Sequence, residues 1–320
     1  MQSVTAAEPR TKFGSAPPDV SDSRAWRRRF AVRGVYWRQY LDWAVINVPF
    51  YLLPILLFFW TLFFYFFAAP ARKAIIRHLN VIFPGSSRLA NYVRAFCTLQ
   101  NFAWTITEAA IYKILKPSFR YILEGEEFLQ QLAQTRGAIV LTAHMGNYDL
   151  GAGVFTEKFQ RPIQMVRAPE PDHETAQHLD MSLQRTGEGA VKVNYNVGEN
   201  LLSVDLLAAI RNGETISIQG DRVNENVSAV PANLFEKKVL LPSGPFVLAA
   251  VAQAPIFPLF VVRAGYRCYK IVVRPPIVCE SSDDSREQAI GSAVEQWARV
   301  LEEMIARHWD QWYAFTPVFK

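Results

Sequence analysis

The stretch Gly137–Leu150, GAIVLTAHMGNYDL, gives the clearest indication of the fold and holds the most informative polar residues of the chain. Residues Ala138–Thr142 are uncharged, apolar and rich in β-branched side chains, a composition that predicts a buried strand. His144 and a Gly146-Asn147 turn signal follow, and from Leu150 onward apolar residues recur at helical spacing. The stretch therefore predicts a strand, a turn and a helix, with a histidine at the carboxyl end of the strand.

A carboxylate five residues after His144 gives this turn a chemical interpretation. The first turn of the following helix brings Asp149 back towards the imidazole, where it can hold one ring nitrogen as N–H and leave the other to accept a proton from an alcohol. A structural histidine beside a helix-capping aspartate fits the same residues, because H-x4-D is frequent by chance. The spacing alone leaves both interpretations open.

The alternation of strand and helix continues on both sides of this stretch. Short apolar runs predict strands at Arg120–Leu123, Ala138–Thr142, Ile163–Ala168, Ala190–Asn194, Thr215–Gln219, Ile256–Arg263 and Tyr269–Arg274. The intervening segments predict helices at Glu126–Gln134, Asp149–Phe159, Glu174–Arg185 and Asn200–Arg211. This rhythm indicates an α/β domain in which flanking helices cover a mostly parallel, layered sheet. Sites in such sheets form at the carboxyl ends of the strands, where His144, Arg167 and the Gly220-Asp221 turn should emerge together.

Composition favours a lipid-associated protein over a nucleic-acid-binding one. Half of the 320 residues are hydrophobic and 13% are aromatic, while the net charge is +5. A basic face suits nucleic acid or anionic lipid, but the chain has no nucleic-acid motif and does have a long apolar run. Its three cysteines, Cys97, Cys268 and Cys279, are scattered, so they predict neither a disulfide framework nor a metal site.

Three regions follow from this composition. Residues 1–23 predict a disordered tail, and residues 24–77 combine a basic, aromatic juxtamembrane stretch with a hydrophobic membrane segment. The 29 residues between Asp42 and Arg72 carry no charge, which is long enough to cross a bilayer once or to enter it and return as a hairpin. Residues 78–320 predict the catalytic domain, which closes on an amphipathic helix at Glu287–His308.

The motif HMGNYD resembles the H-x4-D/E signature of glycerolipid-type acyltransferases, in the form found in the lipid A biosynthesis (late) acyltransferase family. Three further segments resemble family blocks: Ala232–Ala249, which contains P-S-G-P, Ala254–Pro258, and Trp309–Tyr313. The resemblance implies a membrane-associated O-acyltransferase in which His144 is the general base and Asp149 its orienting partner. It also implies that Arg167 holds a phosphate or the polar head of the acceptor. The alternative is that Arg167 is a surface residue without a role in the site.

The remaining site candidates are less specific. Ile218–Arg222 ends in Q-G-D-R, a variant of the family's acidic block, so Asp221 would shape the pocket or hold Arg167, and Arg222 would bind phosphate. In Ser243-Gly244-Pro245 we expect a capping hydroxyl and, around Gly244, exposed N–H groups able to hold an oxyanion or phosphate; plain helix capping is the alternative. Glu199 is either a weak site candidate or a first-turn carboxylate that complements a helix dipole.

The predicted reaction moves a fatty acyl chain from acyl carrier protein or coenzyme A to a hydroxyl of a lipid or glycolipid, without metal or other cofactor. Because both donors are cytoplasmic, we expect the catalytic domain to face the cytoplasm from the bacterial inner membrane. Alternatives are the same chemistry on a phosphoglycolipid, an ornithine-type lipid or a polyketide pigment, a thioester hydrolase, and a non-catalytic scaffold that binds lipid or carrier protein. No G-x-S-x-G elbow supports a serine hydrolase.

Overall fold

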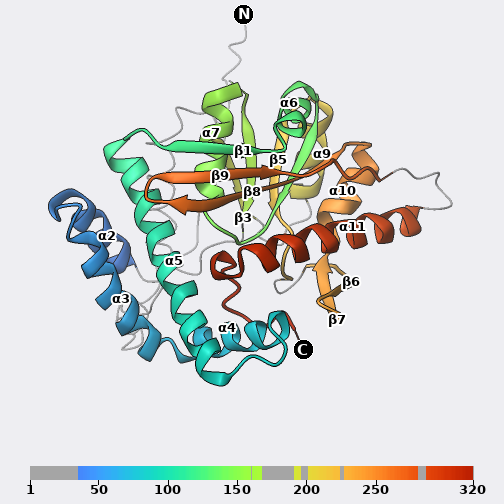
Figure 1. Ribbon diagram of the computed structural model, residues 1–320. Helices are drawn as coiled ribbons and strands as arrows, with labels where there is room; N and C mark the ends of the chain where they lie inside the picture. The colour runs from blue at the N-terminus through green and yellow to red at the C-terminus, as the bar shows by residue number, and fades with distance from the viewer. Residues whose placement is uncertain are drawn as a thin grey trace, which may run out of the picture.

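The structure is a computed structural model, which describes residues 35–159, 161–167, 191–195, 201–223, 227–279 and 286–319 (Figure 1). The predicted tail at 1–23, most of the basic stretch, the predicted helix at 174–185 and Glu199 lie outside these residues.

The helices are α2 (Val35–Asn47), α3 (Leu53–Phe67), α4 (Ala69–Ile82), α5 (Arg88–Leu115), α6 (Glu126–Gln134), α7 (Tyr148–Phe159), α9 (Leu201–Arg211), α10 (Gly244–Ala252), α11 (Arg286–Arg307) and the 3-10 turn η2 (Trp309–Gln311). The strands are β1 (Arg120–Glu124), β2 (Ala138–Thr142), β3 (Ile163–Arg167), β4 (Val191–Tyr195), β5 (Thr215–Gln219), β6 (Ala229–Leu234), β7 (Lys237–Pro242), β8 (Ile256–Gly265) and β9 (Cys268–Val273).

The central sheet confirms the predicted α/β architecture. Seven strands follow the order β1-β9-β8-β2-β5-β3-β4, and every neighbouring pair is parallel except the hairpin β8–β9. Each predicted strand is present within one or two residues of its expected ends. The uncharged run in β2 is buried along its whole length, as expected for a central strand that is covered on both faces.

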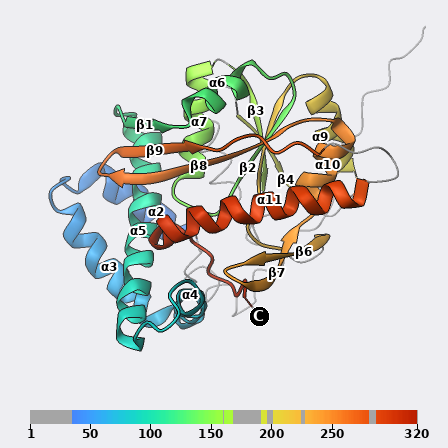
Figure 2. The ribbon, with the colours of Figure 1, turned by 45° about the vertical axis from the view of Figure 1, so that its right-hand side comes forward.

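Side chains of β2 alternate between two hydrophobic cores. Ile139 and Leu141 join the core formed with α9, α10 and α11, whereas Ala138 and Val140 join the core formed with residues of α6 and α7. Figure 2 shows α11 lying across the strands on the first of these faces. Burial of both faces fixes the end of β2, and therefore the position of His144, rigidly within the molecule.

The N-terminal helices α2, α3 and α4 pack mainly against α5, and the end of α4 also contacts the main core through Val81 and Ile82 (Figure 1). The uncharged residues between Asp42 and Arg72 are divided among these three helices. A proline lies in the first turn of both α3 and α4, a position where proline begins a helix. At about 1.5 Å per residue, α3 is only about 22 Å long, less than the roughly 30 Å of a bilayer core. Within the described residues no one helix has the length and apolar character to cross a membrane. The pair α3 and α4 meets those requirements jointly, with a bend of 91° between its members.

Two local features differ from the sequence prediction. Residues 229–242 form the hairpin β6–β7, which was not predicted because Pro231 interrupts it and its turn lacks glycine. Phe235 and Glu236 of that turn both have positive φ, the geometry of a tight two-residue hairpin turn. The predicted capping role of Ser243 is wrong: its side chain makes no capping hydrogen bond, and its backbone carbonyl accepts from Phe246 and Val247 instead.

His78 of α4 lies buried against the C-terminal segment. Its Nε2 accepts a hydrogen bond from the backbone N–H of Val318 at 3.0 Å, and its ring lies against Trp312. Burial, together with the charge of Arg77, lowers the pKa of His78 to about 4.

We therefore expect the protein to lose stability on acidification through His78. The neutral imidazole is favoured in the folded state, so its contribution is complete above the ordinary pKa of 6.5 and disappears as the pH falls through about 4. At about 1.4 kcal/mol per pKa unit, the loss is about 3 kcal/mol. Thermal unfolding from pH 7 to pH 4 should show a smaller decrease in His78→Gln than in the wild type. Parallel curves for the two proteins would contradict this assignment.

Candidate functional site

The pairing of β2 with β5 brings His144 and Asp221 together. These strands are parallel, and Thr142 pairs with Gln219 at their carboxyl ends. Since His144 and Asp221 each lie two residues beyond this pair, the register places them side by side. His144 Nδ1 lies 2.7 Å from Asp221 Oδ1, at 18% and 0% side-chain exposure respectively. The side chain of His144 is therefore partly exposed to solvent, whereas that of Asp221 is fully buried.

The carboxylate of Asp221 determines which imidazole nitrogen carries hydrogen. Burial opposes its ionisation, but the charge and hydrogen bond of His144, the charge of Arg222 and the indole of Trp312 together hold the pKa of Asp221 far below its usual range. An ionised carboxylate can only accept hydrogen bonds. Nδ1 of His144 is therefore the N–H donor, which leaves Nε2 with a lone pair able to accept a proton.

The backbone after His144 is fixed by a tight turn against β8. Gly146 has φ +55°, and a Cβ built on it would lie 2.0 Å from the carbonyl oxygen of Val261. Only glycine fits this approach. Asn147 donates its backbone N–H to the same carbonyl at 2.7 Å and caps α7, since its side-chain oxygen accepts from the N–H of Leu150. The helix cap in this motif is therefore Asn147.

Residues Gln311–Tyr313 hold the same turn from the C-terminal side. The carbonyl of Gln311 accepts the N–H of Gly146 at 3.0 Å, and the N–H of Tyr313 donates to the carbonyl of His144 at 2.7 Å. Between them, the indole Nε1 of Trp312 donates to Asp221 Oδ2 at 3.0 Å. One short segment thus contacts both members of the His144–Asp221 pair.

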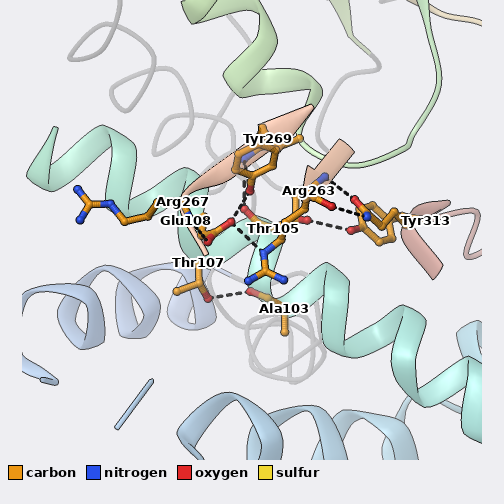
Figure 3. Close-up of polar contacts among 10 residues, drawn as sticks. Ala103, Thr105, Thr107, Glu108, Arg263, Arg267, Tyr269 and Tyr313 are labelled. Carbon is orange, nitrogen blue, oxygen red and sulfur yellow. Dashed lines mark hydrogen bonds and ion pairs between the residues drawn. The ribbon is translucent and has the colours of Figure 1, made fainter. Parts of the chain in front are cut away.

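A buried carboxylate on α5, Glu108, ties this region to the β8–β9 hairpin (Figure 3). Glu108 is fully buried and accepts from Arg263 Nε at 3.1 Å, from the backbone N–H of Arg267 at 2.8 Å and from Tyr269 Oη at 2.6 Å. Tyr269 also accepts a hydrogen bond from Asn147 Nδ2 at 3.4 Å. The network therefore links α5, the hairpin and the turn that follows His144.

Replacing Glu108 by glutamine is expected to destabilise the protein by about 3 to 5 kcal/mol, because it leaves Arg263 without its buried counter-charge. The measurement is the free energy of unfolding in denaturant. Glu127→Gln, the same change at an exposed position of α6, should stay within about 0.5 kcal/mol of the wild type. Equal stability of the two variants would show that the Glu108 network contributes little.

The structure places some predicted site residues and not others. His144, Asp221 and Arg167 end three neighbouring strands at one edge of the sheet, as expected. Arg222 Nη1 donates a hydrogen bond to the carbonyl of Tyr313 at 3.5 Å. The side chain of Asp149 is outside the described part of the chain, although its backbone belongs to α7.

Gly244 begins α10, which packs on β2 and α9, and no atom lies within 4 Å of a Cβ built on it. Gly244 is exposed, whereas Pro245 and Phe246, which follow it, are buried. In the part of the chain that the structure describes, no three His, Cys, Asp or Glu side chains are arranged to hold a metal ion.

Sequence reasoning missed the partnership of Asp221 with His144, and the roles of Trp312 and Glu108. The His144–Asp221 pair could have been found from the ends of the predicted strands Ala138–Thr142 and Thr215–Gln219. Both strands have five residues, and two residues after each of them comes a titratable side chain, His144 or Asp221. For Trp312 the only signal was the resemblance of residues 309–313 to a family segment.

Comparison with known proteins supplies the family. The model of the bacterial lipid A biosynthesis acyltransferases matches residues 26–320. A search of curated proteins found no match. The matched range contains the whole sheet, the His144–Asp221 pair and the C-terminal segment that contacts it. The chain therefore belongs to the bacterial lipid A biosynthesis acyltransferase family and is an acyltransferase.

Proposed function

We propose that this protein transfers a fatty acyl chain from an acyl thioester, of acyl carrier protein or coenzyme A, to a hydroxyl group of a glycolipid acceptor of the lipid A precursor kind. The observation that supports the proposal most directly is the accessible His144 with its Nδ1 held by a buried carboxylate. This is the arrangement that a general base for an alcohol needs. Family membership supports the acyl transfer to a lipid A-like acceptor.

In the proposed reaction, His144 Nε2 removes the hydroxyl proton of the acceptor as its oxygen attacks the thioester carbonyl carbon. Asp221 keeps the imidazole oriented and stabilises the imidazolium that forms. The tetrahedral intermediate then breaks its carbon–sulfur bond, and the leaving thiolate takes the proton from the imidazolium. The products are an ester and a free thiol, and His144 returns to its starting state.

The negative charge on the intermediate needs hydrogen-bond donors or a cation nearby. Arg167 ends β3, next to β5 at the same sheet edge as His144, and we assign it to the acceptor's phosphate or to this charge. The exposed Gly244 at the start of α10 is a second candidate through its own backbone N–H, since the N–H groups of Phe246 and Val247 already donate to the carbonyl of Ser243. Asp149 remains a proposed site residue on its spacing from His144 and on the family resemblance, and Glu199 remains a weak candidate on its place in the sequence.

We further propose that the enzyme acts at the cytoplasmic face of the bacterial inner membrane, with α2 and α3 entering the lipid. Large apolar side chains of this region are exposed, a pattern that soluble monomers rarely show. They are Trp43, Ile46, Phe50, Tyr51, Leu52, Ile55, Phe58, Phe59, Phe63, Phe66 and Phe67.

The test is mass spectrometry of total lipids from cells that carry the wild-type protein, no protein, or His144→Ala. A lipid that gains one acyl chain only with the intact histidine would establish the reaction and identify the acceptor. Purified protein should release free thiol from acyl carrier protein or acyl-coenzyme A only when that lipid is present. An unchanged lipid profile together with no thioester consumption would refute the proposal.

A further inference from the structure

We propose that Trp312 is a positioning residue for catalysis: it orients the Asp221 carboxylate and, through it, the imidazole of His144. The inference rests on the proposed role of His144 as general base and concerns how that base is held in place.

The hydrogen bonds of Asp221 divide between its two oxygens. Oδ1 accepts from His144 Nδ1 at 2.7 Å, and Oδ2 accepts from Trp312 Nε1 at 3.0 Å. A carboxylate that is held at only one oxygen can rotate about its Cβ–Cγ bond, whereas donors on both oxygens fix its plane. The indole therefore sets the direction from which Asp221 meets the imidazole.

The indole is itself held from several sides. Trp312 is 3% exposed, and its ring centroid lies 5.0 Å from that of His78 and 6.2 Å from that of Phe319. Its backbone forms an isolated antiparallel bridge with Met145, the residue after His144. Because one residue is bridged to the His144 turn and bonded to Asp221, it fixes the two members of the pair relative to each other.

The flanking residues strengthen this arrangement. Gln311 inserts its side chain against β8, where Oε1 accepts from the N–H of Arg263 at 2.7 Å and Nε2 donates to the carbonyl of the same residue at 2.9 Å. Tyr313 Oη lies 2.8 Å from Thr105 Oγ1 of α5. Trp312 is therefore anchored to the sheet on one side and to α5 on the other, so its indole has little freedom to follow a displaced carboxylate.

The test is steady-state kinetics of the full chain with four variants: Trp312→Phe, Asp221→Asn, the double variant, and Trp309→Phe. Trp312→Phe removes the indole N–H and should lower kcat about 10- to 100-fold, the effect of losing a hydrogen bond to a charged group, with KM within about twofold of wild type. Trp309 lies three residues away with its ring against Phe83, so the same change there should leave kcat within about twofold.

The double variant separates positioning from a general loss of structure. If Trp312 acts through Asp221, adding Trp312→Phe to Asp221→Asn should lower kcat by less than twofold further. Incorporation of 3-benzothienylalanine at position 312, which replaces the indole N–H by sulfur at nearly the same shape, should reproduce the loss of kcat with a thermal midpoint close to wild type. This analogue tests the idea even if Trp312→Phe does not fold.

Three results would overturn the inference while the wild type remains active: full kcat in the sulfur analogue, an independent multiplicative effect in the double variant, or an effect on KM alone. An inactive wild type would instead refute the proposed function itself, so the two failures are distinguishable.

Discussion

Replacement of His144 by alanine is expected to lower kcat for acyl transfer by about 10²- to 10⁴-fold, the range that a general base contributes. The reason is that Asp221 holds Nδ1 of this imidazole, so that Nε2 keeps its lone pair, on a side chain that is partly exposed to solvent. The measurement is release of thiol from an acyl thioester in the presence of the acceptor lipid. The proposed association with membranes should be unchanged, because the exposed apolar side chains lie on α2 and α3 and between them.

His144→Gln is the control for an indirect effect of the alanine substitution. Alanine leaves the buried Asp221 carboxylate without its closest donor, a change that costs stability. The glutamine amide can donate to that carboxylate but cannot act as a base. We expect both variants to be inactive and the glutamine variant to have the higher thermal midpoint. Substantial turnover in either folded variant would remove His144 from the reaction.

Asp221→Asn is expected to produce the second large effect, a loss of about 10³- to 10⁴-fold in kcat with little change in KM. The asparagine amide can turn its N–H towards Nδ1 of His144, which forces the hydrogen onto Nε2 and removes the basic lone pair from the substrate side. It also removes the negative charge that stabilises the imidazolium. The measurement is the same thiol-release assay, run over a range of acceptor concentrations.

Asp149→Asn provides the comparison for Asp221→Asn. The H-x4-D motif predicts that Asp149 orients the imidazole, but Asp221 already occupies Nδ1. We therefore expect Asp149→Asn to lower the rate less than Asp221→Asn. A larger loss in the Asp149 variant would assign the orienting role to that residue, and a wild-type rate would assign it no part in orientation.

Much of the sheet could be predicted from local sequence. The bounds of β2 and β5 agree with expectation because both strands are uncharged runs with buried side chains, and the motif correctly placed His144 at a strand end. The hairpin β6–β7 could not be predicted, because its turn places Phe235 and Glu236 at positive φ. Phenylalanine and glutamate are not residue types that indicate such a turn.

The site was less predictable than the fold because it is assembled from distant segments. His144 and Asp221 are 77 positions apart, and the register that joins them is a property of the whole sheet. Trp312 meets Asp221 from 91 positions away, in a segment whose apolar residues look like ordinary packing. The local pattern of apolar residues predicts which face of a helix or strand a side chain lies on. It does not predict which other strand or segment packs against that side chain.

The position of Gln311–Tyr313 along the chain also has a consequence for biosynthesis. Every strand of the sheet, together with His144 and Asp221, has been synthesised when translation reaches Val273, but Trp312 follows about 40 residues later. At about 5 to 20 residues per second, the indole that donates to Asp221 is therefore added about 2 to 8 seconds after the last strand. Because Trp312 contacts Asp221, the His144–Asp221 pair can reach its final geometry only after this interval.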